Sequence, residues 1–155
     1  MTSARGRANH ALYLARIVMA AWRETLARQD VPASILAQAF LGGVRDHLTA
    51  AYGWFLLEVS RTEPLPDCPP HCCAELPPPP EGKVFPGEVQ EFQQLEQRGW
   101  LREMLHSQST VPLPVRQHNN LAVATTDQVG PDQVEQWLLQ LESAVERMAD
   151  SLDEY

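Results

Sequence analysis

Residues 62–87 constrain the fold of this chain more than any other stretch, because they hold nine of its 13 prolines and all three cysteines. Proline lacks the backbone N–H that a helix interior requires, and its ring clashes with the preceding turn. Helical periodicity is present on both sides of the stretch and is lost within it. The sequence therefore predicts helices that are separated by a proline- and cysteine-rich loop.

Apolar residues recur at steps of three and four in four segments, a spacing that places side chains on one face of a helix. These segments predict four main helices, at residues 7–28, 32–61, 86–107 and 130–154. Glycine costs about 1 kcal/mol relative to alanine inside a helix, so two helical pieces that meet at Gly99 are the alternative for the third. Residues 111–126 are expected to form a polar connection. The predicted fold of residues 1–155 is all-α, a single-domain up-down bundle of four main helices.

The first two predicted helices are joined by only a few residues, so they should lie antiparallel as neighbours. A turn near residues 30–31 makes the numbers of facing residues sum to roughly 61. This register predicts a contact between Arg16 and Asp46. It also places Gly42 and Gly43 where they would leave room for bulky side chains of the first helix.

The last predicted helix has the clearest pattern, a coiled-coil-like seam of about three heptads. Its apolar residues step by three or four and are Val134, Leu138, Leu141, Val145, Met148 and Leu152. The rest of the bundle is the expected partner of this seam, and a homodimer through the same helix is the alternative.

The composition is that of a globular protein, with 44% hydrophobic and 21% charged residues. The longest apolar run, residues 50–57, is far shorter than the roughly 18 residues that a membrane-spanning helix needs. The net charge is −8; residues 1–62 hold seven arginines against four acidic residues, and residues 63–155 hold five basic against 16 acidic residues. We therefore expect no binding to nucleic acid or to a membrane. An odd number of cysteines suits a reducing compartment and favours a cytoplasmic location.

Cys68, His71, Cys72 and Cys73 form the sharpest local cluster, and thiolate and imidazole are the ligands that zinc prefers. A metal site or a thiol-redox site in this loop is therefore one alternative function. Structural zinc sites usually combine two separated ligand pairs, which this cluster lacks. We accordingly expect no cofactor, and we expect all three thiols to react readily in the native protein.

Two weaker patterns occur in the third predicted helix. Glu103 and His106 form one Glu-x-x-His motif, whereas a di-iron bundle needs two such motifs. Arg102 and His106 share a helix face and resemble the Arg…His pair of HEPN-type ribonucleases, although three residues separate them here instead of four to six. An RNase-like bundle is thus the third functional hypothesis.

The hairpin register also brings Asn9, Tyr13, His47 and Tyr52 near one another. Buried polar groups have to be hydrogen-bonded, so such a cluster would mainly hold the two helices in register. A ligand pocket lined by these four candidate binding residues is the alternative.

Four stretches together resemble one protein family. They are Arg-Ala-Asn-His-Ala-Leu-Tyr-Leu-Ala-Arg at residues 7–16, His-Leu-Thr-Ala-Ala-Tyr-Gly-Trp-Phe-Leu-Leu-Glu-Val at residues 47–59, Trp-Leu-Arg-Glu-Met-Leu at residues 100–105, and the final helix at residues 137–155. The family consists of small cytoplasmic helical-bundle proteins of pseudomonads and related gammaproteobacteria and is grouped as a domain of unknown function. The resemblance is weakest at residues 62–87. It implies a helical bundle and carries no activity, substrate or catalytic residue.

The sequence contains no assembled set of catalytic motifs, and its core is built from helices alone. We therefore favour a non-enzymatic protein, a cytoplasmic interaction or regulatory bundle whose partner is another protein.

Overall fold

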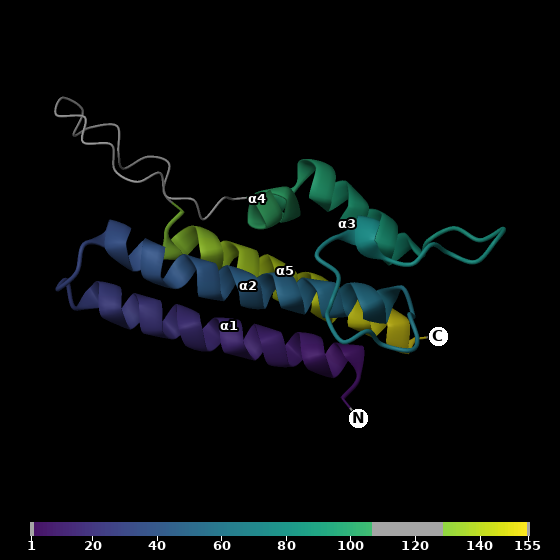
Figure 1. Cartoon of the computed structure of the whole chain (residues 1–155), viewed down its shortest axis with the longest axis horizontal. Coiled ribbons are helices and arrows are strands. Elements are labelled where there is room, and N and C mark those ends of the chain that lie inside the picture. Colours follow the sequence, from purple (N-terminus) through teal and green to yellow (C-terminus); the bar gives the residue numbers. More distant parts are fainter. Residues whose placement is uncertain (1, 107–128, 155) are drawn as a thin grey trace.

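The computed structural model describes residues 2–106 and 129–154, and every regular element within these ranges is a helix (Figure 1). The long helices are α1 (Ala4–Ala27), α2 (Ala33–Val59) and α5 (Pro131–Asp153); the shorter elements are α3 (Gly87–Arg98), α4 (Trp100–His106) and a 3-10 turn, η1 (Cys73–Glu75). The predicted all-α, single-domain fold is confirmed. In the described part of the chain, no helix has the length and apolar character that crossing a membrane requires. The predicted connection at residues 111–126 lies outside the described residues.

The helices α1 and α2 form the expected antiparallel hairpin (Figure 1). The ring of Trp22 stacks on that of Phe40, with 6.1 Å between the centroids. Near the other end of the hairpin, the guanidinium carbon of Arg7 lies 4.6 Å from the centroid of the Trp54 ring. Both pairs agree with the predicted register, in which facing residue numbers sum to roughly 61.

Two contacts predicted from that register are wrong. Arg16 forms an ion pair with Glu142 of α5, with 2.7 Å between Nη2 and Oε1, and not with Asp46. A Cβ atom added to Gly42 or Gly43 would meet nothing within 4 Å, so these glycines accommodate no side chain of α1. The register states which residues lie at the same level of two helices, whereas the direction of a side chain also depends on its angle around the helix axis.

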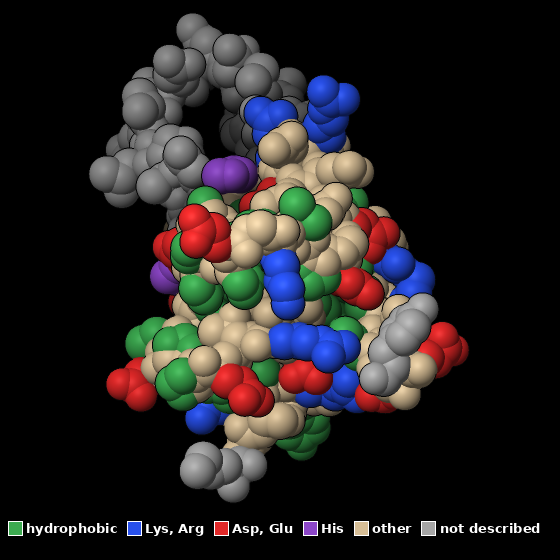
Figure 2. Space-filling model, turned by 90° about the vertical axis from the view of Figure 1, so that its right-hand side faces the viewer, with side chains coloured by type: hydrophobic (Ala, Val, Ile, Leu, Met, Phe, Trp, Pro, Cys, Tyr) green, Lys and Arg blue, Asp and Glu red, His purple; other side chains and the backbone are tan. Residues whose placement is uncertain are grey.

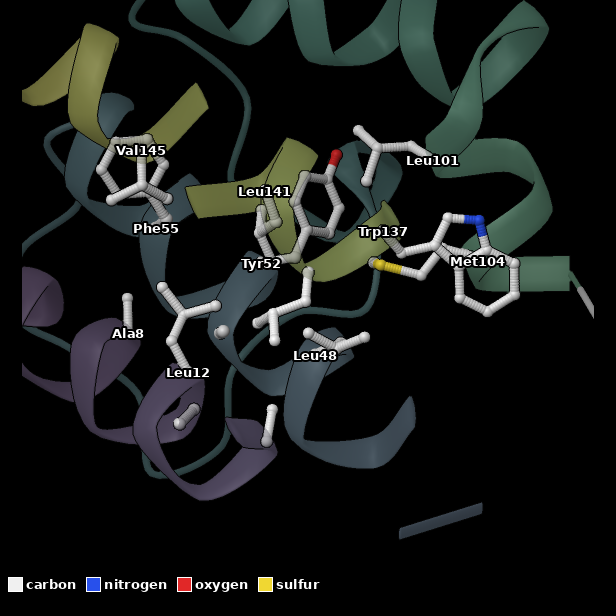
Figure 3. Close-up of a cluster of buried hydrophobic side chains, with 14 of the residues drawn as sticks. Ala8, Leu12, Leu48, Tyr52, Phe55, Leu101, Met104, Trp137, Leu141 and Val145 are labelled. Atoms are coloured by element: carbon white, nitrogen blue, oxygen red, sulfur yellow. The ribbon is translucent and has the colours of Figure 1, made fainter. Parts of the chain in front are cut away.

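The apolar seam of α5 is buried against the hairpin. Its first five residues are at most 6% exposed, Leu152 is half-buried, and the side chains converge with those of α1, α2 and α4 (Figure 3). Three arginines of α1 fasten the edge of α5, in the pairs Arg5–Asp153, Arg16–Glu142 and Arg23–Asp132, with Glu135 as a second partner of Arg23. The seam is thus covered by the chain's own helices, the partner that the sequence favoured, and the alternative of a homodimer through the same helix stays a prediction.

The third predicted helix is divided into α3 and α4, as the alternative for Gly99 proposed. Gly99 caps α3 in an extended conformation, and its N–H donates to the Leu95 carbonyl over 2.9 Å. Arg45 of α2 then fixes the end of α4, because its Nε donates to the carbonyl of Met104 over 3.0 Å and its Nη2 to that of Leu105. The pair α3–α4 therefore forms an outer layer on α2 and α5 (Figure 1).

Candidate functional site

The proline segment, defined as residues 62–86, crosses the second half of α2 at the end of the molecule that carries both termini (Figure 1). A Cβ atom on Gly53 would overlap the carbonyl oxygen of Pro70 and would lie 2.9 Å from Cβ of Pro69. Only glycine permits so close an approach of another backbone. Gly53 is therefore the point at which the proline segment is seated on α2.

The turn that leads from α2 into the proline segment has its own hydrogen bonds. Arg61, at φ 54°, donates its N–H to the Glu58 carbonyl, and Thr62 donates to the Leu57 carbonyl. This is the Schellman arrangement, which satisfies the last carbonyl groups of a helix. It ends α2 at Val59, six residues beyond Gly53, and directs the chain back over the helix.

A polar junction, made of Tyr52, Cys73 and Glu96, joins the proline segment to two helices. Oε1 of Glu96 accepts a hydrogen bond from the Tyr52 hydroxyl and a second one, of 2.9 Å, from the backbone N–H of Cys73. The Cys73 Sγ atom lies 3.5 Å from the Tyr52 oxygen. Tyr52 is completely buried, and its hydroxyl points out of the apolar cluster toward the α3–α4 layer (Figure 3). The junction thus fixes η1 against α2 and α3.

The surroundings of the polar junction keep its two weak acids protonated. Burial raises the pKa of Tyr52 far above its usual value. Burial is also the main reason that the pKa of the Cys73 thiol rises to about 12, and the nearby Glu96 carboxylate raises it further. At neutral pH, both groups therefore remain uncharged. The hydrogen bonds of the Tyr52 hydroxyl and of the Cys73 N–H both end on Oε1 of Glu96.

An open groove of about 480 Å³ lies beside the seated part of the proline segment. We call it the proline groove, because half of its ten lining residues are prolines: Pro64, Pro66, Pro69, Pro70 and Pro77. Leu57 of α2 and Thr62 also line it, and Cys68, His71 and Glu75 supply its reactive or charged groups. A second hollow, of about 550 Å³, shares Leu57 and Thr62 with it. Figure 2 views this end of the molecule, where apolar side chains are interspersed with charges of both signs.

His71 and Glu75 form an exposed pair on the groove wall. The backbone N–H of His71 donates to Oε2 of Glu75, and the Nδ1 atom of His71 lies 3.2 Å from the same oxygen. The backbone hydrogen bond is the main reason that the pKa of Glu75 is lowered. Glu75 is therefore a carboxylate at neutral pH and contributes a fixed negative charge to the groove.

The structure separates the predicted metal ligands. Cys68 is exposed on the groove wall, Cys72 is half-buried, and Cys73 is turned into the core. His71 uses its Nδ1 atom for Glu75. No set of three or more Cys, His, Asp and Glu residues in residues 2–106 and 129–154 is arranged to hold a metal ion.

The predicted binding cluster in the hairpin is not formed. Asn9 is exposed, the Tyr13 side chain is 57% exposed and His47 is half-buried, whereas Tyr52 is buried in the polar junction. Successive positions of a helix point about 100° apart, so residues at one level of the hairpin can still face opposite sides. The prediction of a shared buried site for these four residues is therefore wrong.

The two patterns of the third predicted helix lie on the surface of α4. Arg102, Glu103 and His106 are all exposed, and Arg102 donates to the Gln97 carbonyl over 3.4 Å. None of these three residues belongs to the proline groove or to the polar junction. The hypothesis of an RNase-like pair stays a prediction.

The burial of Cys73 leads to a prediction that replaces the expectation of three reactive thiols. In native protein at pH 8, a thiol reagent such as 5,5′-dithiobis(2-nitrobenzoate) should modify Cys68 quickly and Cys73 at least about 100-fold more slowly, because the thiolate is the reactive form and Cys73 is both buried and protonated. Mass spectrometry of quenched samples identifies the modified residue. In denaturant, all three should react alike; equal rates in the native protein would contradict the placement of Cys73.

A scan against protein-family models and searches of curated proteins and of solved structures found no match to this chain. The family resemblance of the sequence therefore stays a prediction, and the function has to be argued from the site.

Proposed function

We propose that this protein is a non-enzymatic interaction module that binds another protein through the proline groove. The observation that carries the proposal is a groove with proline-rich walls, whose volume of about 480 Å³ lies within the roughly 300–1,000 Å³ of ligand pockets. Binding costs less free energy when the binding surface does not have to become ordered first. Proline fixes the backbone torsion φ, so the five lining prolines lose little freedom when a partner binds.

The attachment of the proline segment supports the same proposal. Pro69 and Pro70 rest on Gly53, and three residues further along the segment the backbone N–H of Cys73 donates to Glu96 of α3. The groove walls are thus anchored to the helical bundle at two points, Gly53 and Glu96. The role of the bundle in this proposal is to hold these walls at the surface for a partner. An open groove on an anchored loop suits an exposed segment of a partner better than an enclosed small molecule.

The proposal predicts that one substitution in the groove weakens partner binding without unfolding the protein. Cys68→Arg places a long charged side chain on the groove wall, at a residue that is already exposed. Val84→Arg is the matched control, because Val84 is 81% exposed and does not line the groove. Partners retained from a native lysate by the wild-type protein are identified and purified, and their dissociation constants are measured with all three proteins.

A partner that binds the wild type and Val84→Arg equally, and binds Cys68→Arg at least about 10-fold more weakly, is the expected result. Melting temperatures within about 2 °C of one another exclude unfolding as the cause. Equal binding by Cys68→Arg and Val84→Arg would show that partners use another surface.

A further inference from the structure

The walls of the proline groove select the kind of side chain that fits them best. The rings of Pro64, Pro66 and Pro69 line the groove with C–H groups, and Leu57, which is 2% exposed, lies behind them at the groove lining. The face of an aromatic ring carries partial negative charge and packs favourably against such C–H groups. Proline and aromatic rings are paired in the same way where proline-rich ligands dock into aromatic-lined grooves. Here the prolines belong to the receptor, so the aromatic ring has to come from the partner.

The side chains that line the proline groove and the adjoining hollow carry a negative net charge. Glu75 is on the groove wall, and Glu63 lines the adjoining hollow. The proline segment as a whole holds four acidic residues against one lysine, Lys83, within a chain of net charge −8. The adjoining hollow is also lined by two arginines, Arg5, which is paired with Asp153 and Glu58, and Arg61. Its acidic residues, Glu58, Glu63 and Asp153, outnumber these arginines. Electrostatic complementarity therefore favours a positively charged partner and disfavours an acidic one.

From these two observations we propose that the proline groove recognises an exposed segment of a partner protein in which an aromatic side chain is flanked by lysine or arginine. The aromatic ring packs on the prolines, and the basic side chains lie near Glu75 and Glu63. This inference rests on the proposed function and narrows it to one class of partner. It assigns to Glu75 the role of selecting charge and to the prolines the role of selecting an aromatic ring.

Three capped pentapeptides test the inference by nuclear magnetic resonance titration of the full chain. The probe is acetyl-Gly-Lys-Trp-Lys-Gly-amide; the controls are the same peptide with leucine in place of tryptophan and the same peptide with glutamate in place of both lysines. Binding is followed at the backbone amides of Thr62, Cys68 and His71, which line the groove. We expect the probe to bind at least about 10-fold more tightly than either control, with the largest shifts at these amides.

Two variants assign the effect to the groove. Glu75→Gln should bring the affinities of the lysine and glutamate peptides at least about 3-fold closer together, because it removes the charge of the groove wall. Glu81→Gln removes an exposed charge of the same segment that does not line the groove, and it should leave the affinities unchanged. Cys68→Arg should weaken the probe at least about 10-fold.

The outcomes separate this inference from the proposed function. Equal affinity for the leucine peptide would overturn the aromatic requirement, and equal affinity for the glutamate peptide would overturn the basic one. Shifts confined to amides outside the groove, or no shifts at all, would overturn the inference as a whole. In each of these cases, the proposed function would still be supported if Cys68→Arg reduces the capture of protein partners. If Cys68→Arg captures the same partners as the wild type, the proposed function itself is wrong.

Discussion

Leu141→Asp is expected to lower the free energy of unfolding by at least about 4 kcal/mol, which is a large part of the roughly 5–15 kcal/mol of a typical domain. Leu141 is completely buried in the seam of α5, where it packs with residues of α1, α2 and α4 (Figure 3). The substitution removes apolar contacts that typically contribute about 2–5 kcal/mol, and it also buries a carboxyl group without a partner. Thermal and urea unfolding, followed by circular dichroism, measure the loss.

Leu139→Asp is the matched control, because it makes the same chemical change on the same helix. The Leu139 side chain is 51% exposed, so the new carboxylate remains in water. We expect its effect on the free energy of unfolding to stay within about 0.5–1 kcal/mol. Similar destabilisation by both substitutions would mean that α5 is packed on a different face.

Gly53→Ala and Gly43→Ala are expected to change stability in opposite directions. Both glycines lie inside α2, where alanine is favoured by roughly 1 kcal/mol in a helix that has room for the methyl group. Gly43 has that room, since a Cβ atom would meet nothing within 4 Å, and its substitution should raise the free energy of unfolding by about 0.5–1 kcal/mol. At Gly53 the methyl group would overlap the Pro70 carbonyl, and we expect a loss of about 2 kcal/mol.

The Gly53→Ala protein also reports on the groove. Displacement of Pro70 should shift the amide resonances of Cys68 and His71, which line the proline groove, and leave those of α1 unchanged. Urea unfolding with both variants gives the sign of each effect. If Gly53→Ala were as stabilising as Gly43→Ala, the proline segment would not rest on α2.

The helices and their main packing faces could be predicted from the residues alone. The seam of α5 repeats every three or four residues, and this local pattern states both that the segment is helical and which side is buried. The same holds for α1, where Leu12, Met19 and Trp22 are buried as their spacing predicts. The register of the α1–α2 hairpin could also be predicted from the sequence, because a short connection leaves little freedom in it.

The direction in which individual polar side chains point could not be predicted from the sequence. Asn9 and Tyr13 are at the expected level of the hairpin and still face solvent, and Arg16 reaches α5. Which side chains of the hairpin are buried depends on where the next long helix of the bundle packs against it. The position of α5 around the hairpin depends on packing between residues more than 100 positions apart, which no local periodicity contains.

The candidate site depends even more strongly on contacts between distant residues. Cys68 and Cys73 are five positions apart in one loop, and nothing in their local sequence distinguishes the exposed thiol from the buried one. Glu96 has the sequence surroundings of an ordinary acidic residue on a helix, and Gly53 is one member of an apolar run. Residue spacing along the chain thus accounts for the helices and their buried stripes, because a helix forms from neighbours in sequence. The groove exists because Pro70 meets Gly53 and Cys73 meets Glu96, contacts that form only once the chain has folded back on itself.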